Sequence, residues 1–126
     1  SSALDTDWTM KVLDVHPSGF AQRLNDGIVR ARFRHGYQRE ELLKPNEVEA
    51  YDLDLWGTCT RLAPGHRLRV EVSSSAFPKF DRNLNTGGPL GRESRGVVAN
   101  QTVRHDRSHP SSIVIPVIPS SAPTPP

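Results

Sequence analysis

Apolar residues recur at every second position in several stretches of this chain, and this alternation constrains its fold more than any other feature. Leu68, Val70 and Val72 are each flanked by charged residues within 67–72, and a similar apolar–acidic alternation runs over 48–55. Successive side chains of a β-strand point to opposite faces, so a period of two indicates strands with one buried and one solvated face. The sequence therefore predicts an all-β protein.

Turn residues divide the chain into short strands. Eleven prolines and nine glycines are distributed between the alternating stretches, as in His16-Pro17-Ser18-Gly19 and Asn25-Asp26-Gly27, where proline and glycine favour tight turns. We expect strands over 8–15, 20–24, 28–34, 48–55, 59–62, 67–72, 97–105 and 112–118. Short strands in this number, with almost no helix, favour a β-sandwich of the jelly-roll type.

Two segments do not fit the strand pattern. Residues 74–96 have no sustained periodicity and are rich in turn residues, and loops of that length are usually functional or interfacial. Residues 120–126 are dominated by proline and cannot bury enough surface to become ordered. The 126 residues suit one domain. We expect a jelly-roll domain over 1–119 and a disordered tail over 120–126.

Composition excludes several classes of protein. The formal net charge is +2, which is too small to indicate nucleic-acid binding. No apolar run approaches the roughly 18–20 residues that would span a membrane. A single cysteine excludes an intrachain disulfide and a cysteine-based metal centre. We expect no cofactor, no nucleic-acid or membrane partner and, because no signal peptide is visible, a cytoplasmic protein. The sequence leaves oligomerisation open.

Candidate catalytic patterns are weak. Ser94 lies in a loop and lacks the glycine spacing of a serine-hydrolase elbow. His105, Asp106 and His109 are close in sequence, but the following Pro110 and the strand pattern deny the helix that would bring two histidine ligands together. A polar turn is the favoured interpretation of this segment. The sequence predicts no catalytic residue and no metal ligand in this chain.

Arginine supplies 13 of the 16 basic residues, and its distribution suggests two alternatives. Arg30, Arg32 and Arg34 share one face of a predicted strand and would suit phosphate if they formed a stripe with arginines of a neighbouring strand. Acidic residues occupy equally regular faces, so ion pairs across a solvated sheet are the favoured interpretation.

Four stretches together resemble a known family. They are 5–17, 26–34, 64–83 (including Pro64-Gly65-His66-Arg67 and Phe80-Asp81-Arg82-Asn83), and 109–118. In this order and spacing they are similar to the C-terminal domain of the α/β-hydrolase family that contains X-prolyl dipeptidyl aminopeptidases, cocaine esterases and cephalosporin acylases. The resemblance extends over almost all of residues 2–119.

The resemblance implies a jelly roll of the galactose-binding-domain type that packs on a catalytic α/β-hydrolase domain lying earlier in the polypeptide. It also implies that the first strands of the sandwich and the catalytic serine, aspartate and histidine precede Ser1. This chain would then be a non-catalytic accessory domain of a serine hydrolase acting on amide or ester bonds. Within the long loop we expect contacts with the catalytic domain from Phe77, Phe80, Asp81, Arg82, Asn83 and Asn85.

Two other functions remain open from the sequence. A free-standing carbohydrate-binding module would use Trp8, Tyr37 or Trp56 as a platform for a sugar ring. An independent metalloenzyme would use His105, Asp106 and His109.

Overall fold

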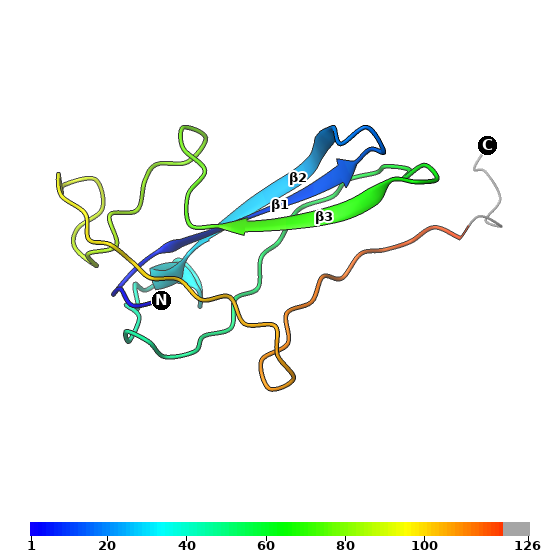
Figure 1. Cartoon of the computed structure of the whole chain (residues 1–126). Helices are drawn as coiled ribbons and strands as arrows, with labels where there is room; N and C mark the ends of the chain where they lie inside the picture. The colour runs from blue at the N-terminus through cyan, green and yellow to red at the C-terminus, as the bar shows by residue number, and fades with distance from the viewer. Residues whose placement is uncertain (120–126) are drawn as a thin grey trace.

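The computed structural model describes residues 1–119 of the chain, so the tail predicted over 120–126 lies outside the described residues. It contains three strands, β1 (Asp7–Val15), β2 (Ala21–Arg30) and β3 (Arg67–Ser73), and one short 3₁₀ turn, η1 (Ala31–Phe33). The strands form one antiparallel sheet in the order β2-β1-β3 (Figure 1). The all-β prediction is confirmed, and the open sheet is consistent with part of a β-sandwich.

A tight turn joins β1 to β2, as the sequence predicts. The backbone N–H of His16 donates to the carbonyl of Phe20 at 2.8 Å, and the N–H of Gly19 donates to the carbonyl of His16 at 2.9 Å. Gly19 has a φ of 89°, which glycine adopts without a steric penalty. The paired ends of the two strands are therefore closed by residues whose chemistry suits the turn.

The second predicted turn, at Asn25-Asp26-Gly27, is wrong. These residues lie inside β2, which continues to Arg30 and pairs with β1 along its length. Val12 pairs with Asn25 and Leu13 pairs with Arg23, so Leu24 is an extra residue in β2, a β-bulge. The ladder with β1 supplies hydrogen bonds on both sides of the local turn signal, and the bulge absorbs the extra residue.

Four further predicted strands are wrong, because they have no hydrogen-bonded neighbouring strand among residues 1–119. They are 48–55, 59–62, 97–105 and 112–118. A β-strand needs a neighbouring strand for its backbone hydrogen bonds, and alternation alone does not provide one. The alternation over 48–55 nevertheless appears in the burial, because Tyr51, Leu53 and Leu55 are half-buried while Asp52 and Asp54 are exposed.

The buried core is small and lies mainly along β1. Its apolar members are Ala3, Trp8, Val12, Leu13, Val15, Ala31 and Leu43. The ring of Trp8 packs on Tyr51, with centroids 5.8 Å apart, which places the 48–55 segment against the sheet. Burial raises the pKa of Tyr51 above its usual range. By contrast, every residue of β3 is exposed, so no part of residues 1–119 packs over this strand.

The N-terminal segment that precedes β1 makes backbone hydrogen bonds to the 43–46 loop and to Asn100. The N–H of Asn46 donates to the carbonyl of Ser1 at 2.7 Å, and the N–H of Ser2 donates to the carbonyl of Asn100 at 3.0 Å. The N–H of Leu43 donates to the carbonyl of Leu4 at 2.8 Å. These bonds hold the flanking loops against one end of the sheet. Among the described residues, none of the helical structure is long and apolar enough to cross a membrane.

Candidate functional site

A buried ion pair lies beside the N-terminal end of β1. Arg32 in η1 donates from Nε to Asp5 Oδ2 at 2.7 Å, and its backbone N–H donates to Asp5 Oδ1 at 3.0 Å. The side chains of Arg32 and Asp5 are 2% and 0% exposed. The arginine also donates to Glu40 at 3.1 Å and to the carbonyl of Gly88 at 3.0 Å. Each buried charge is thus compensated, as burial requires.

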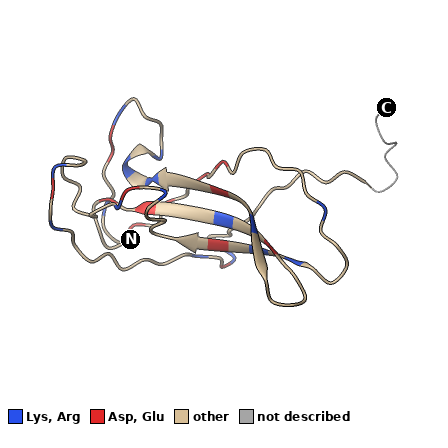
Figure 2. Ribbon diagram, turned by 90° about the horizontal axis from the view of Figure 1, so that it is seen from above, with Lys and Arg blue, Asp and Glu red and all other residues tan. Residues whose placement is uncertain are grey.

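A second ion pair continues this cluster at the end of β2. Arg30 pairs with Asp7 of β1 through two bonds of 2.8 and 3.0 Å, and it reaches Asp81 in the long loop at 3.0 Å. Hydrogen bonding to Asp7 raises the pKa of Arg30 above its ordinary value. Figure 2 shows acidic and basic residues side by side at this end of the sheet. The ion pair between Arg30 and Asp81 therefore attaches the long loop to the sheet.

Asn83 bridges the two ion pairs. Its Nδ2 donates to Asp5 Oδ2 and to Asp7 Oδ1, both at 2.9 Å, and its Oδ1 accepts the backbone N–H of Asn85 at 2.9 Å. Asn85 in turn donates to the carbonyl of Val97 at 3.0 Å and has a φ of 64°, which asparagine tolerates. We define the docking loop as residues 74–96, and these two asparagines fix its path.

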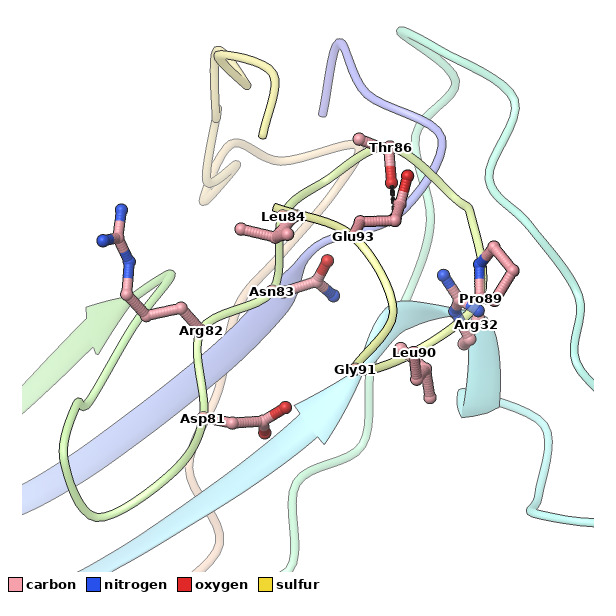
Figure 3. A pocket seen from close by; sticks show the side chains of 10 residues that line it. All are labelled: Arg32, Asp81, Arg82, Asn83, Leu84, Thr86, Pro89, Leu90, Gly91 and Glu93. Atoms are coloured by element: carbon pink, nitrogen blue, oxygen red, sulfur yellow. Dashed lines mark hydrogen bonds between the residues drawn. The ribbon is translucent and has the colours of Figure 1, made fainter. Parts of the chain in front are cut away.

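The other residues predicted for this loop differ in how far they are exposed. Phe77 is 69% exposed, Phe80 is half-buried under the ammonium group of Lys79 at 5.2 Å, and Asp81 and Arg82 are exposed. Figure 3 shows Arg82 pointing away from the other labelled side chains while Asn83 points toward the sheet. The structure brings Asp81, Asn83 and Asn85 into one hydrogen-bonded cluster with the sheet and leaves Phe77 and Arg82 facing solvent.

A shallow pocket of about 280 Å³ lies between η1 and the docking loop. Arg32 forms one side, and Asn83, Thr86 and Glu93 contribute to the other. The hydroxyl of Thr86 donates to Glu93 across the loop (Figure 3). Arg32, Asn83, Thr86 and Glu93 already hydrogen-bond within the chain, so these polar groups of the pocket hold the loop in place.

The sequence predicts ion pairs for Arg30 and Arg32, but it does not identify Asp7 and Asp5 as their partners. Ion pairing of the arginines is confirmed, but Arg32 is buried in η1 and does not lie on a solvated strand. The acids of the predicted faces, such as Asp52 and Asp54, are not its partners. The spacing of Asp5 and Asp7 directly before an apolar strand is the signal that could have drawn attention to them.

Asp106 lies 3.3 Å from His109 Nδ1, but among the described residues His105 does not join them in a group of three ligand atoms. Asp106 accepts the backbone N–H groups of Ser108 and His109, each at 2.9 Å, which is a polar turn. These bonds, led by that of His109, lower the pKa of Asp106 below its usual range. The sugar platform is wrong for Trp8, which is 8% exposed and covered by Tyr51, whereas Tyr37 and Trp56 are 82% and 78% exposed on separate loops.

Comparison with known proteins decides the family. A family model described as the X-Pro dipeptidyl-peptidase C-terminal non-catalytic domain matches residues 1–114. The chain belongs to this family. The resemblance inferred from the four sequence stretches is confirmed, as is the interpretation of the chain as a non-catalytic C-terminal domain.

This X-Pro dipeptidyl-peptidase C-terminal domain is 46% identical over 120 residues to cocaine esterase of Rhodococcus sp. (strain MB1 Bresler). The match covers 94% of this chain but only 21% of the esterase, so the chain spans about a fifth of that relative. Among solved structures it is similar to an aminopeptidase from a marine sediment archaeon, Thaumarchaeota archaeon, with a TM-score of 0.63 and 36% identity. An α-amino acid ester hydrolase gives a TM-score of 0.59 and 33% identity. Each covers 68% of this chain, which corresponds to 15% of the solved chain.

Proposed function

We propose that this domain packs on the catalytic α/β-hydrolase domain of the same polypeptide and that the docking loop forms part of the contact. The supporting relatives are named as an esterase, an aminopeptidase and an ester hydrolase, so the partner domain is proposed to be a serine hydrolase acting on ester or amide bonds. The role of this chain is to support that domain, and the reacting groups belong to the partner.

One observation carries the proposal: the docking loop is anchored on its inner side and presents an aromatic side chain on its outer side. Asn83 bonds to both Asp5 and Asp7 at 2.9 Å, while Phe77 is 69% exposed. A loop that is already ordered loses little conformational entropy on contact, and exposed aromatic side chains supply much of the energy of interfaces. Arg82, also exposed, adds a bidentate donor for an acidic partner group.

The test uses the full-length polypeptide that contains this domain, with Phe77→Ala as the variant. Removing an aromatic anchor from an interface typically costs more than about 1 kcal/mol. We expect calorimetry to show the unfolding of the two domains becoming less coupled, with the catalytic domain unfolding at a lower temperature. Tyr37→Ala is the matched control, because Tyr37 is an exposed aromatic residue of another loop, at 82%.

Equal unfolding profiles for Phe77→Ala and the parent protein would count against the docking loop as a contact. If Phe77→Ala and Tyr37→Ala both uncouple the domains, the contact is spread over a wider surface than proposed. A double variant, Phe77→Ala with Arg82→Ala, separates the aromatic contribution from the charged one.

A further inference from the structure

A second cluster of polar side chains lies at the opposite end of the sheet from the docking loop (Figure 1). Asp14 is in β1, His16 begins the turn after β1, and His66 ends the turn before β3. In the antiparallel pairing, Asp14 lies opposite Leu68. Residues two apart share a face of a sheet, so Asp14 and His16 share a face on one strand, as do His66 and Leu68 on the other. The register therefore brings the three side chains together.

The distances within this Asp14–His16–His66 cluster suit a metal ion. His66 Nδ1 lies 2.8 and 2.9 Å from the two carboxylate oxygens of Asp14, and His16 Nε2 lies 3.8 Å from Asp14 Oδ2. One ligand atom from each of the three residues falls within 4.8 Å of the others. Tetrahedral zinc with bonds of 2.0–2.2 Å requires donor atoms about 3.3 Å apart. Small side-chain rotations would reach that spacing.

An ion pair between Asp14 and His66 explains only two members of the cluster. His16 Nε2 is buried and has no hydrogen-bond partner in the part of the chain that the structure describes. Buried polar atoms are normally satisfied. The His16 ring lies against that of His66, with centroids 4.2 Å apart, and against Phe20 at 5.2 Å, so it is held with Nε2 facing the carboxylate. A metal ion would give this nitrogen a partner.

The three side chains of the cluster differ in exposure, and His16 is the most exposed of them. The side chains of Asp14, His66 and His16 are 7%, 16% and 33% exposed. Two imidazoles and one carboxylate are a set of ligands that zinc accepts, and a fourth position toward solvent would take water. Pro17 and Gly65 are also close, since a Cβ on Gly65 would lie 3.3 Å from Pro17 Cγ. The two turns thus already touch beside the cluster.

We propose that Asp14, His16 and His66 bind a divalent zinc ion that clips the β1–β2 turn to the turn preceding β3. The ligand atoms are Asp14 Oδ2, His16 Nε2 and His66 Nδ1. A metal bound only by the folded state stabilises that state by mass action. The clip acts on β3, a strand in which every residue is exposed among residues 1–119. It is independent of the proposed docking of the opposite end on a catalytic domain.

The test is a titration of the 126-residue chain with zinc chloride, followed by calorimetry for stoichiometry and affinity. We expect one zinc ion per chain and a loss of affinity of about tenfold or more in His16→Gln and in His66→Gln, as for other changes to metal sites. His109→Gln is the matched control. His109 also faces an aspartate, with Nδ1 3.3 Å from Asp106 Oδ1. Among residues 1–119, however, this pair does not belong to a group of three ligand residues. This control should bind zinc as the parent does.

Nitrogen-detected NMR of the histidine rings in the unmutated chain gives an answer even if a variant fails to fold. We expect zinc to shift His16 Nε2 and His66 Nδ1 and to leave the ring of His109 unchanged. The proposal is overturned if affinity is unaltered in His16→Gln, if the His109 ring shifts in place of the other two, or if the chain binds no zinc at 100-fold excess over protein.

Discussion

The Arg32–Asp5 pair carries more structural weight than any exposed ion pair of the molecule. Both side chains are almost fully buried, at 2% and 0% exposed. The carboxylate receives bonds from the Arg32 backbone, the Arg32 side chain and Asn83. By comparison, Arg39 is 82% exposed where it meets Glu41, and such pairs contribute little because water screens them. The difference between the two arginines lies in their surroundings, since their chemistry is the same.

Removing one partner of the buried pair should therefore be severe. We predict that Arg32→Ala lowers the free energy of unfolding by about 3–5 kcal/mol, because Asp5 would remain buried and charged without its main partner. Urea unfolding followed by circular dichroism measures the change. Arg39→Ala should alter it by less than about 0.5 kcal/mol. A loss below about 1 kcal/mol for Arg32→Ala would show that Asp5 is satisfied by its remaining donors.

At this scale the sequence predicts the site in part. Asn83 and Asn85 are predictable as loop residues because amide side chains commonly bond to nearby backbone, and the bond from Asn83 to the N–H of Asn85 has this form. Asp5 and Arg32 are not predictable as partners, because they are 27 residues apart and meet only after β2 turns into η1. Whether Phe77 and Phe80 touch a second domain stays a prediction.

Gly27 shows how a local turn signal is overruled at the scale of an element. It lies within β2 opposite Met10, and a Cβ at this position would lie 2.7 Å from the carbonyl oxygen of Asp54. Because glycine has no side chain, the 48–55 segment can approach the strand closely at this position. A prediction based on turn signals does not take this packing into account. The same residue that suggests a hairpin in sequence is a point of close packing in the fold.

Substitution of this glycine tests the packing directly. We predict that Gly27→Ala destabilises the chain by about 1–3 kcal/mol, because the added carbon overlaps backbone that cannot move without displacing the 48–55 segment. Gly57→Ala is the matched control, since nothing lies within 4 Å of a Cβ there. Chemical denaturation measures both, and Trp8 fluorescence reports displacement of Tyr51. Equal stability of the two variants would mean that the close approach at Asp54 is readily relieved.

A predicted strand is confirmed where a second segment of the described chain pairs with it, and it is wrong where no such segment is present. The 8–15 and 67–72 predictions agree with β1 and β3 to within a residue or two, because each has a neighbour in the sheet. The 97–105 and 112–118 segments have the composition of strands, but the described residues supply no ladder for them. Alternation predicts which face of a strand is buried. It does not predict which other segment pairs with that strand, because the pairing depends on residues far away in the sequence.

The whole molecule combines a well-packed end with long exposed segments. Val98 and Val114 are 88% and 92% exposed, and the stretch after the turn at 106–109 runs extended toward the C-terminus in Figure 1. Apolar side chains in such numbers on the surface are typical of regions that are covered in a larger assembly. The fold class is predictable from the sequence because it depends on the alternation of apolar and polar residues. Which apolar side chains become buried depends on long-range packing, which that alternation does not specify.

Limited proteolysis should separate these two regions. We predict that trypsin cuts first after Arg104 and Arg107, which are exposed, and much later after Arg32, which is held in the buried pair. Mass spectrometry of a time course gives the order of cleavage. In the full-length polypeptide, protection of Arg104 and Arg107 is the expected result if the extended segment is covered there. Early cutting after Arg32 would contradict the packing of η1.

The bonds made by Ser1 and Ser2 to Asn46 and Asn100 bear on the exchange of domains between members of this family. A crossover placed at or after Ser1 would exchange residues whose backbone already belongs to the folded unit, and the incoming peptide would have to reproduce the same carbonyl and amide positions. A crossover upstream of Ser1 would leave these backbone hydrogen bonds intact. The useful junction for exchanging such domains is therefore set by these hydrogen bonds, and sequence similarity alone would not reveal it.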